Sequence, residues 1–216
     1  DGQYELKADF IGYKEVINEV QVQGSDVELN FSLSPQDFVT DEVVITATRA
    51  DADAPISQTT RNRQQIEAEY SGQDAAFLID ELSPSVVSYS ESGTSLSNYG
   101  GLRLRGIDQS RINMTLNGVP LNDMIDQGVF FSNFTDFGNS IESVQIQRGV
   151  GTSVNGTSSY AGSINFESIS LSDTEPSSEV QLTGGSFATM RASAEVSTGK
   201  MDNGFSFYTR YTHTLS

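Results

Sequence analysis

The end of the chain alternates strictly between apolar and polar residues, and this pattern constrains the fold most. The alternation runs over 188–197, a glycine-containing turn follows at 199–204, and the alternation resumes over 205–215. A period of two places the apolar side chains on one face, which predicts two antiparallel strands of about ten residues each. Two structures share this pattern: a half-exposed hairpin of a soluble sheet, which is the commoner one, and the wall of an outer-membrane barrel.

The first 34 residues also predict short strands separated by glycine turns. Apolar residues alternate with charged ones over 4–9, valines recur over 16–22, and strict alternation returns over 27–33. About three strands are too few for an independent sandwich, so we expect the end of a β-sandwich whose first half lies upstream. The stretch DGQYELKADFIGYKEV (1–16) resembles the end of the carboxypeptidase-regulatory type of sandwich.

Residues 35–60 are predicted to be a linker that contains one short β-prone run. This run, DEVVITATR at 41–49, lies between Pro35 and the polar, alanine-rich stretch 50–55, whose composition is typical of disorder. The run is either an ordinary buried strand or an extended segment that adds a strand to the edge of a partner's sheet.

The middle of the chain predicts a small α+β domain. The only good helical signal lies within 61–82, where residues 73–82 place Phe77, Leu78 and Leu82 on one face and Pro84 closes the helix. Asn117-Gly118 predicts a tight turn after one of the strands. Five short strands are expected, at 86–89, 102–105, 112–116, 144–147 and 163–166.

The composition argues against several classes of function. Asp plus Glu number 29 against 12 Lys plus Arg, and the formal net charge of -17 disfavours binding to a phosphate backbone. With no cysteine and one histidine, the chain has little material for a thiolate nucleophile, a Ser-His-Asp triad or a Cys/His metal site. The glycines near 150 do not complete a nucleotide-binding loop, because Val154 and Thr157 replace its third glycine and its lysine. We therefore expect no catalytic residue, no metal and no cofactor, and a protein that is not an enzyme.

Four ordered motifs resemble the plug domain of TonB-dependent outer-membrane receptors. They are GGLRLRGI at 100–107, RINMTLNGVPL at 111–121, IESVQIQRG at 141–149 and NGTSSYAGSIN at 155–165. Two positions depart from the family pattern: Val150 stands where proline is usual, and Ser163 stands where a second glycine is usual. Both changes fall in loops or at a loop end and leave the resemblance in place.

The resemblance implies an architecture. Residues 61–170 would form an α+β plug, a small mixed sheet with short helices and long loops, and 171–216 would be the first antiparallel strands of a 22-stranded transmembrane β-barrel. Residues 1–34 resemble the N-terminal extension common in Bacteroidetes receptors. In the 35–60 linker the resemblance implies a TonB box, the segment that pairs as a β-strand with TonB and its ExbB/ExbD motor. Its residues are Asp41, Glu42, Val43, Val44, Ile45, Thr46, Ala47 and Thr48.

The resemblance also implies a function. The protein would be a gated importer of a scarce nutrient, such as an iron–siderophore complex or cobalamin, in the outer membrane with its N-terminal part in the periplasm. A surface lipoprotein is a further implied partner. A SusC-like glycan importer is the alternative within the family, although the Gly-Tyr-Gly usual after its TonB box is absent at 46–49. A soluble β-sandwich adhesion or binding module is the alternative from another class, and it leaves the helix and the arginine-glycine motifs unexplained.

Individual residues acquire roles through the resemblance. Arg105 and Arg148 each end a strand before a glycine, and arginines at these positions of the family pair with barrel glutamates. Ligand-facing loops are expected at 90–99, 122–132 and 152–160. The aromatic residues in them either stack on a planar ligand or, more commonly, pack the plug. The candidate ligand-facing residues are Tyr99, Asp123, Phe130, Phe131 and Tyr160.

Overall fold

The computed structural model describes residues 2–10, 13–34, 49–91, 93, 99–151, 159–170, 175–186 and 188–215. The chain divides into two compact units, Asp1–Val43 and Val44–Ser216. Within the described residues, no helix combines the length and the apolar character needed to cross a membrane. The run at 41–48, predicted to be the TonB box, lies outside the described residues.

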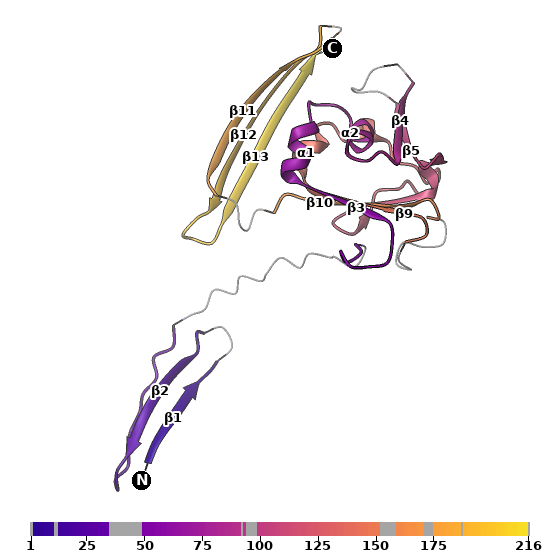
Figure 1. Ribbon diagram of the computed structural model, residues 1–216. Helices are drawn as coiled ribbons and strands as arrows, with labels where there is room; N and C mark the ends of the chain where they lie inside the picture. Colours follow the sequence, from indigo (N-terminus) through magenta and orange to yellow (C-terminus); the bar gives the residue numbers. More distant parts are fainter. Residues whose placement is uncertain are drawn as a thin grey trace. The chain divides into compact units, whose positions relative to one another are not determined.

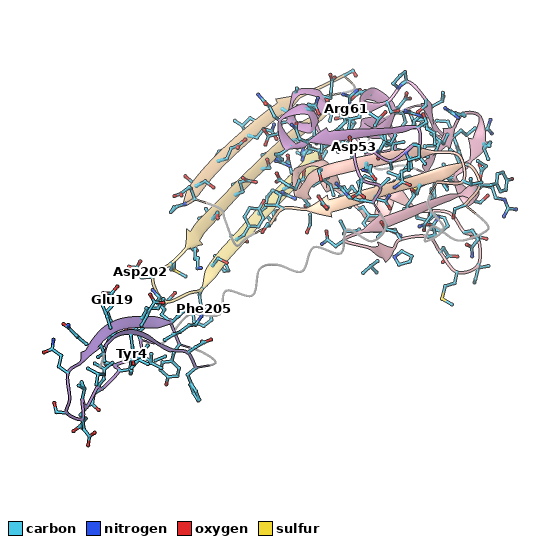
Figure 2. All side chains as sticks on the ribbon, turned by 60° about the horizontal axis from the view of Figure 1, so that its bottom comes forward. Tyr4, Glu19, Asp53, Arg61, Asp202 and Phe205 are labelled. Carbon is cyan, nitrogen blue, oxygen red and sulfur yellow. The ribbon has the colours of Figure 1, made fainter. Side chains whose placement is uncertain are left out.

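The first unit contains an antiparallel pair of strands, β1 (Gly2–Ala8) and β2 (Val16–Val22). Alternation gives the pair an apolar face and a polar face. Tyr4 is half-exposed on the apolar face, and Glu19 lies on the polar one (Figure 2). The two strands expected at the start of the chain are therefore confirmed.

The strand expected over 27–33 is not formed. Residues 24–34 join no sheet in the part of the chain that the structure describes, and one hydrogen bond from the Lys14 N–H to the Ser34 carbonyl (2.9 Å) holds their end. Alternation alone is insufficient here, because a strand needs a neighbouring strand whose main chain can complete its hydrogen bonds.

The second unit contains three sheets among its described residues, with strand orders β3-β9-β10-β7-β8, β4-β5-β6 and β11-β12-β13. Strand β10 runs parallel to β7 and antiparallel to β9, so the five-stranded sheet is mixed, as expected. The five strands predicted in the middle of the chain are present as β4, β5, β7, β9 and β10. The strands are β3 (Gln58–Asn62), β4 (Val86–Ser90), β5 (Gly100–Leu104), β6 (Ile107–Asp108), β7 (Ile112–Leu116), β8 (Val119–Pro120), β9 (Ile141–Arg148), β10 (Gly162–Ser168), β11 (Ser177–Gly184), β12 (Met190–Lys200) and β13 (Ser206–Leu215).

The helix predicted over 73–82 is confirmed as α2 (Ala75–Leu82). Its buried residues are Ala75, Ala76, Leu78, Ile79 and Leu82, a set with helical spacing. Of the expected face, Leu78 and Leu82 are buried, and Phe77 packs partly buried against the core. The described residues also contain the short 3-10 helices η2 (Gln109–Arg111), η3 (Phe131–Asn133) and η4 (Phe137–Ser140).

Helix α1 (Arg63–Glu69) was not predicted as a separate element. It begins with a capping box, in which the Asn62 side chain accepts a hydrogen bond from the Gln65 N–H and the Gln65 side chain accepts one from the Asn62 N–H. Two donors that the first turn would leave unpaired are thereby satisfied. The Asn-x-x-Gln spacing is the sequence signal that identifies this helix.

The five-stranded sheet has one apolar and one polar face. Ile146 and Ile164 are opposite each other in the register of β9 and β10, and both are fully buried with Met114 in the core. Helices α1 and α2 lie on this side of the sheet (Figure 1). We call residues 49–170, which contain this sheet, both α-helices and β4–β6, the central domain. The opposite face of the sheet is lined by Thr60, Gln145, Gln147, Ser163, Asn165 and Thr115.

In the β11–β13 sheet, the polar face of the middle strand, β12, is the buried one. On β12, Arg191, Ser193 and Ser197 are buried, whereas Met190 is exposed. Exposed apolar side chains continue on the neighbouring strands. The predicted pair of long alternating strands is confirmed as β12 and β13, with their turn between Asp202 and Phe205 (Figure 2). In a sheet that faces water on its outer side, the apolar side chains would be the buried ones.

Substitution of Gly162 tests the packing of the central domain. This glycine begins β10 with a φ of 154°, and a Cβ there would collide with the Gln147 carbonyl oxygen and the Leu104 side chain. We expect Gly162→Ala to lower the free energy of unfolding by about 1–3 kcal/mol, measured by urea unfolding followed by circular dichroism. The control is Gly184→Ala on β11, where a Cβ meets nothing within 4 Å. Equal losses in the two variants would contradict the packing argument.

Candidate functional site

Asp136 lies where the central domain meets the β11–β13 sheet. It precedes η4 with a φ of 60°, a left-handed conformation that Asp tolerates better than most residues. Its side chain is only 8% exposed. A carboxylate buried to this extent requires compensating charges and hydrogen bonds.

Two arginines supply the compensating charges. Arg191 of β12 forms an ion pair with Asp136 Oδ1, and Arg210 Nε of β13 lies 2.7 Å from Asp136 Oδ2. We call these three residues and the neutral donors around the carboxylate the junction cluster. The neutral donors are Tyr70 Oη (3.0 Å) and Asn139 Nδ2 (2.9 Å) to Oδ1, and Thr212 Oγ1 (2.6 Å) to Oδ2.

Both arginines make further contacts with the central domain. The guanidinium of Arg191 lies over the Tyr70 ring, 5.1 Å from its centroid, and passes so close to Gly72 that a Cβ there would collide with it. Arg210 donates from Nη1 to the Asn139 carbonyl at 2.7 Å. Burial raises the pKa of the Tyr70 phenol, and the positive charge of Arg191 offsets part of that rise.

The junction cluster is suited to holding two surfaces together. Buried ion pairs are geometrically demanding, because each charge loses its hydration and must find all its partners in the protein. Arg191 and Arg210 come from two paired strands, while Asp136 comes from a turn more than fifty residues earlier. The cluster therefore fixes the β11–β13 sheet against the central domain in one register. Among the described residues, no group of three or more His, Cys, Asp or Glu is placed to hold a metal ion.

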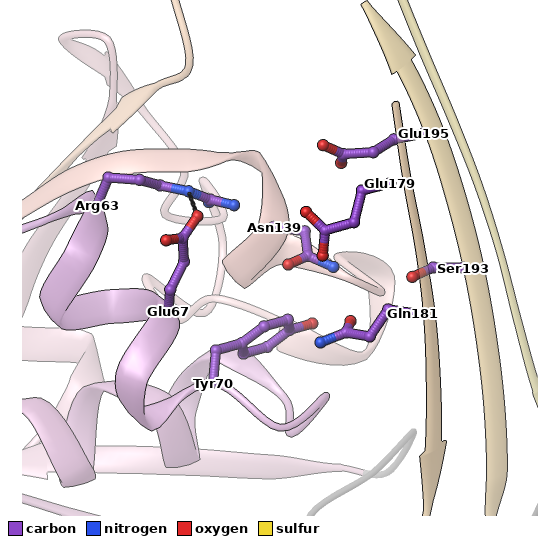
Figure 3. A pocket seen from close by; sticks show the side chains of 8 residues that line it. All are labelled: Arg63, Glu67, Tyr70, Asn139, Glu179, Gln181, Ser193 and Glu195. Atoms are coloured by element: carbon purple, nitrogen blue, oxygen red, sulfur yellow. Dashed lines mark hydrogen bonds and ion pairs between the residues drawn. The ribbon is translucent and has the colours of Figure 1, made fainter. Parts of the chain in front are cut away.

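A polar cavity of about 260 Å³ lies beside the junction cluster, between α1 and strands β11 and β12 (Figure 3). Arg63 and Glu67 of α1 form an ion pair on one side (2.6 Å), and Glu179 and Glu195 oppose each other across β11 and β12 on the other. Helix α1 therefore faces these strands across a hydrophilic space large enough for several water molecules. The lining residues are Arg63, Glu67, Tyr70, Asn139, Glu179, Gln181, Ser193 and Glu195.

The first described residues of the second unit are anchored on the polar face of the five-stranded sheet. Arg49 donates from Nη2 to the carbonyls of Ser143 (3.1 Å) and Asn165 (2.9 Å), and its Nη1 lies 3.1 Å from Glu167 Oε2. Burial lowers the pKa of Arg49, and the Glu167 carboxylate opposes that effect. The run at 41–48 thus leads directly into a firmly bound arginine, which sequence reasoning did not single out.

The structure places Arg105 and Arg148 away from the junction cluster. Arg105 is exposed with a φ of 52°, and its main-chain N–H donates to the Ser85 carbonyl. Arg148 donates from Nε to Ser57 Oγ (2.8 Å) and from Nη1 to Thr59 Oγ1 (2.7 Å), so its guanidinium joins β9 to β3 and the chain before it. Pairing of these two arginines with barrel glutamates stays a prediction. The ion pairs that the structure shows between the central domain and the β11–β13 sheet involve Asp136 instead.

The candidate ligand-facing aromatic residues divide by burial. Tyr99 is 67% exposed and Tyr160 is 51% exposed, and Phe130 is also exposed. Phe131 is 2% exposed and packs in the hydrophobic core, so its ring does not face solvent. Most of the loops that carry Tyr99 and Tyr160, at 92–98 and 152–158, lies outside the described residues.

The loop around Asp123 is rigidly built. Asp123 Oδ1 accepts hydrogen bonds from the N–H groups of Ile125 (2.7 Å) and Asp126 (2.9 Å), and these bonds lower the pKa of its carboxyl group. The carboxylate therefore stabilises the loop while ionised, and this stabilisation is lost as the pH falls through the lowered pKa. Met124 and Ile125 are almost fully exposed at the tip. Sequence reasoning missed these two residues, whose apolar character inside a polar loop was the available signal.

Comparison with protein families shows to which family the chain belongs. The family model described as the TonB-dependent receptor plug domain matches residues 50–163. The chain belongs to this family. The match covers the central domain from the residue after Arg49 to the start of β10 and includes Asp136. No curated protein matches the chain.

Solved structures of TonB-dependent receptors have a similar fold. The ferric yersiniabactin uptake receptor FyuA of Yersinia pestis is 17% identical with a TM-score of 0.53, and the match covers 77% of this chain and 25% of that one. The alcaligin outer-membrane receptor FauA of Bordetella pertussis is 21% identical with a TM-score of 0.55, and the match covers 74% of this chain and 27% of that one. FpvA of P. aeruginosa, bound to heterologous pyoverdines, is 17% identical with a TM-score of 0.54, and the match covers 75% of this chain and 20% of that one. The chain spans about a quarter of the length of these structures.

Neutralising Asp136 tests the junction cluster of the plug domain. Asp136→Asn keeps the shape and tolerates the left-handed backbone, but it leaves two buried guanidinium groups without their counter-ion. We expect the free energy of unfolding to fall by about 3–5 kcal/mol, measured by chemical denaturation. The control is Glu67→Gln, which breaks the exposed pair with Arg63 and should cost at most about 0.5 kcal/mol. Similar effects of the two variants would show that the junction cluster does not hold the sheet.

Proposed function

We propose that the chain is the plug region of a TonB-dependent receptor that imports a scarce nutrient across the outer membrane. The observation that carries the proposal is the family match over 50–163, which begins directly after the β-prone run and Arg49. In this proposal the plug, with the sequence limits 61–170, closes the lumen of a barrel. Residues 35–60 are the linker, and the first unit lies in the periplasm.

The β11–β13 sheet is proposed to be the first part of the barrel wall. Its polar face packs on the plug domain through the junction cluster, while its apolar side chains are exposed on the other face. This is the arrangement expected of a strand between lipid and a polar lumen. A soluble β-sandwich module would have the reverse arrangement, so the exposed apolar face argues against that alternative.

The run at 41–48 is proposed to be the TonB box. An extended segment adds to the edge of a partner's sheet through main-chain hydrogen bonds, and TonB is the partner in this family. Support comes from Arg49 and Ala50, the two residues that follow the run, which are hydrogen-bonded to β9 and β10 of the plug domain. A pull on the box would therefore act on a defined point of the plug domain.

An iron–siderophore complex is the favoured cargo. Three of the structures with a similar fold are named for ferric yersiniabactin, alcaligin or iron-bound pyoverdine. Cobalamin is the second candidate cargo. The alternative kind of receptor is a SusC-like glycan importer, which would work with a surface lipoprotein. Tyr99, Phe130 and Tyr160 are proposed to meet the ligand, since their exposed rings can stack on a planar surface.

Proline substitution tests the TonB box. Val44→Pro removes a main-chain donor and fixes φ, so we expect binding to the purified periplasmic domain of the cognate TonB to weaken by at least about tenfold. The measurement is the dissociation constant of the full-length receptor in detergent, from isothermal titration calorimetry. Val44→Thr is the control, because it keeps both the N–H and the β-branched shape. The proposed box is refuted when Val44→Pro binds TonB as tightly as Val44→Thr does.

Alanine substitutions separate ligand contact from packing. We expect Tyr99→Ala to weaken binding of a ferric siderophore about 2- to 10-fold without changing the unfolding midpoint. Phe131→Ala should lower the free energy of unfolding by about 3–5 kcal/mol, because its ring lies in the core. The probes for calorimetry with the full-length receptor are the ferric complexes of yersiniabactin, alcaligin and pyoverdine, together with cyanocobalamin. Unchanged affinity in Tyr99→Ala for every probe that binds would exclude the contact.

A further inference from the structure

The exposed face of the β11–β13 sheet, here called its outer face, is largely apolar and carries one histidine. Leu182 of β11, Ala192 of β12 and His213 of β13 are direct neighbours on this face in the strand register. His213 is exposed, and its imidazole forms no hydrogen bond or ion pair with any described residue. The two acidic residues of the three strands, Glu179 and Glu195, line the polar cavity on the opposite face. The imidazole is therefore a hydrogen-bond donor with no carboxylate on its own face of the sheet.

A groove of about 320 Å³ lies beside His213 on the outer face. Its floor is low, because Gly184 has no side chain and Ala192 has only a methyl group. Its walls are three large apolar side chains, each more than half exposed: Leu182, Met190 and Leu215. These walls offer no hydrogen-bonding group, so the groove suits a hydrocarbon chain better than a polar solute.

The position of His213 along β13 is that of a residue near the edge of a membrane. Phe205, which is 71% exposed, lies at the turn before β13 (Figure 2), and exposed aromatic rings are typical of the boundary between lipid and water. His213 follows it by eight residues, which at about 3.3 Å per residue and a strand tilt of about 40° gives a rise of about 20 Å. Because the apolar band of a barrel is about 25 Å tall, the imidazole in the proposed barrel wall lies within about 5 Å of the second boundary. Lipid headgroups are within its reach there.

We propose that the groove binds one anionic phospholipid, with an acyl chain against Leu182, Met190 and Leu215 and a phosphate oxygen that accepts a hydrogen bond from His213. The proposal rests on the proposed function, because it requires the outer face to lie in a membrane. A donor at this depth costs free energy unless it is paired, and the phosphate supplies the partner that the protein does not. An anionic headgroup fits better than a zwitterionic one, since the outer face has no carboxylate to receive an ammonium group.

Native mass spectrometry of the full-length protein in detergent tests the site. The probes are phosphatidylglycerol and phosphatidylcholine with identical dioleoyl chains. We expect the first phosphatidylglycerol to bind about 3- to 10-fold more tightly than the first phosphatidylcholine, which corresponds to one net hydrogen bond. His213→Leu removes the donor and should abolish this preference, whereas His213→Gln keeps an N–H donor and should retain about half of it or more.

Filling the groove separates the contribution of the acyl chain from that of the headgroup. Ala192→Phe places a ring on the floor of the groove and should weaken the first binding step of both lipids about threefold or more. Thr209→Val is the matched control, because Thr209 is an exposed polar residue on the same face of β13 but outside the groove. Its affinity for both lipids should stay as in the native protein. His213→Leu decides the matter if Ala192→Phe does not fold, since leucine is favourable on a lipid-facing strand.

Three results would overturn the proposal. The first is equal affinity of the native protein for the two lipids, and the second is an unchanged preference in His213→Leu. The third is a dimer that dissociates in Ala192→Phe, which would assign the groove to a second copy of the chain. Cell fractionation reports separately on the proposed function. A full-length protein in the outer membrane that does not distinguish the lipids loses this site alone, whereas one found outside the membrane fractions loses both.

Discussion

Strands β9 and β10 are buried on both faces, and the rest of the second unit depends on how they satisfy this constraint. One face carries Ile146 and Ile164 into the core beneath the helices, and the other carries amides and hydroxyls that bind each other and the chain before β3. A shift of one residue in their register would place glutamines in the core and isoleucines in the polar layer. The alternation of side chains therefore fixes the pairing, and the pairing fixes where the helices and the chain before β3 attach.

Alternation also explains how much of the fold could be predicted. The period of two located the middle strands and the long pair β12 and β13, because burial on one face is encoded locally. It failed over 27–33, which pair with no strand in the described part of the chain, and it gave no information about α1, whose signal is the capping box at Asn62. Periodicity also left open which face of β12 is buried, and the structure buries the polar one.

The candidate sites were less predictable than the fold. The junction cluster joins Asp136 to arginines that follow it by more than fifty residues, and no local pattern indicates which buried acid meets which base. Arg148 was singled out by its place in a motif, but its partners in the structure are Ser57 and Thr59. Phe131 and Phe130 are neighbours in sequence, and only the three-dimensional packing distinguishes the buried ring from the exposed one.

The cavity beside α1 shows that the plug domain and the β11–β13 sheet meet in two different ways. The plug domain and the β11–β13 sheet are joined by directional charges at Asp136, whereas α1 and strands β11 and β12 are separated by a hydrophilic space. Interdigitated side chains resist sliding, but a layer of water re-forms its hydrogen bonds as surfaces shift. The position of the sheet against the plug domain therefore comes from the geometry of the charges around Asp136, and side-chain packing at α1 contributes little to it.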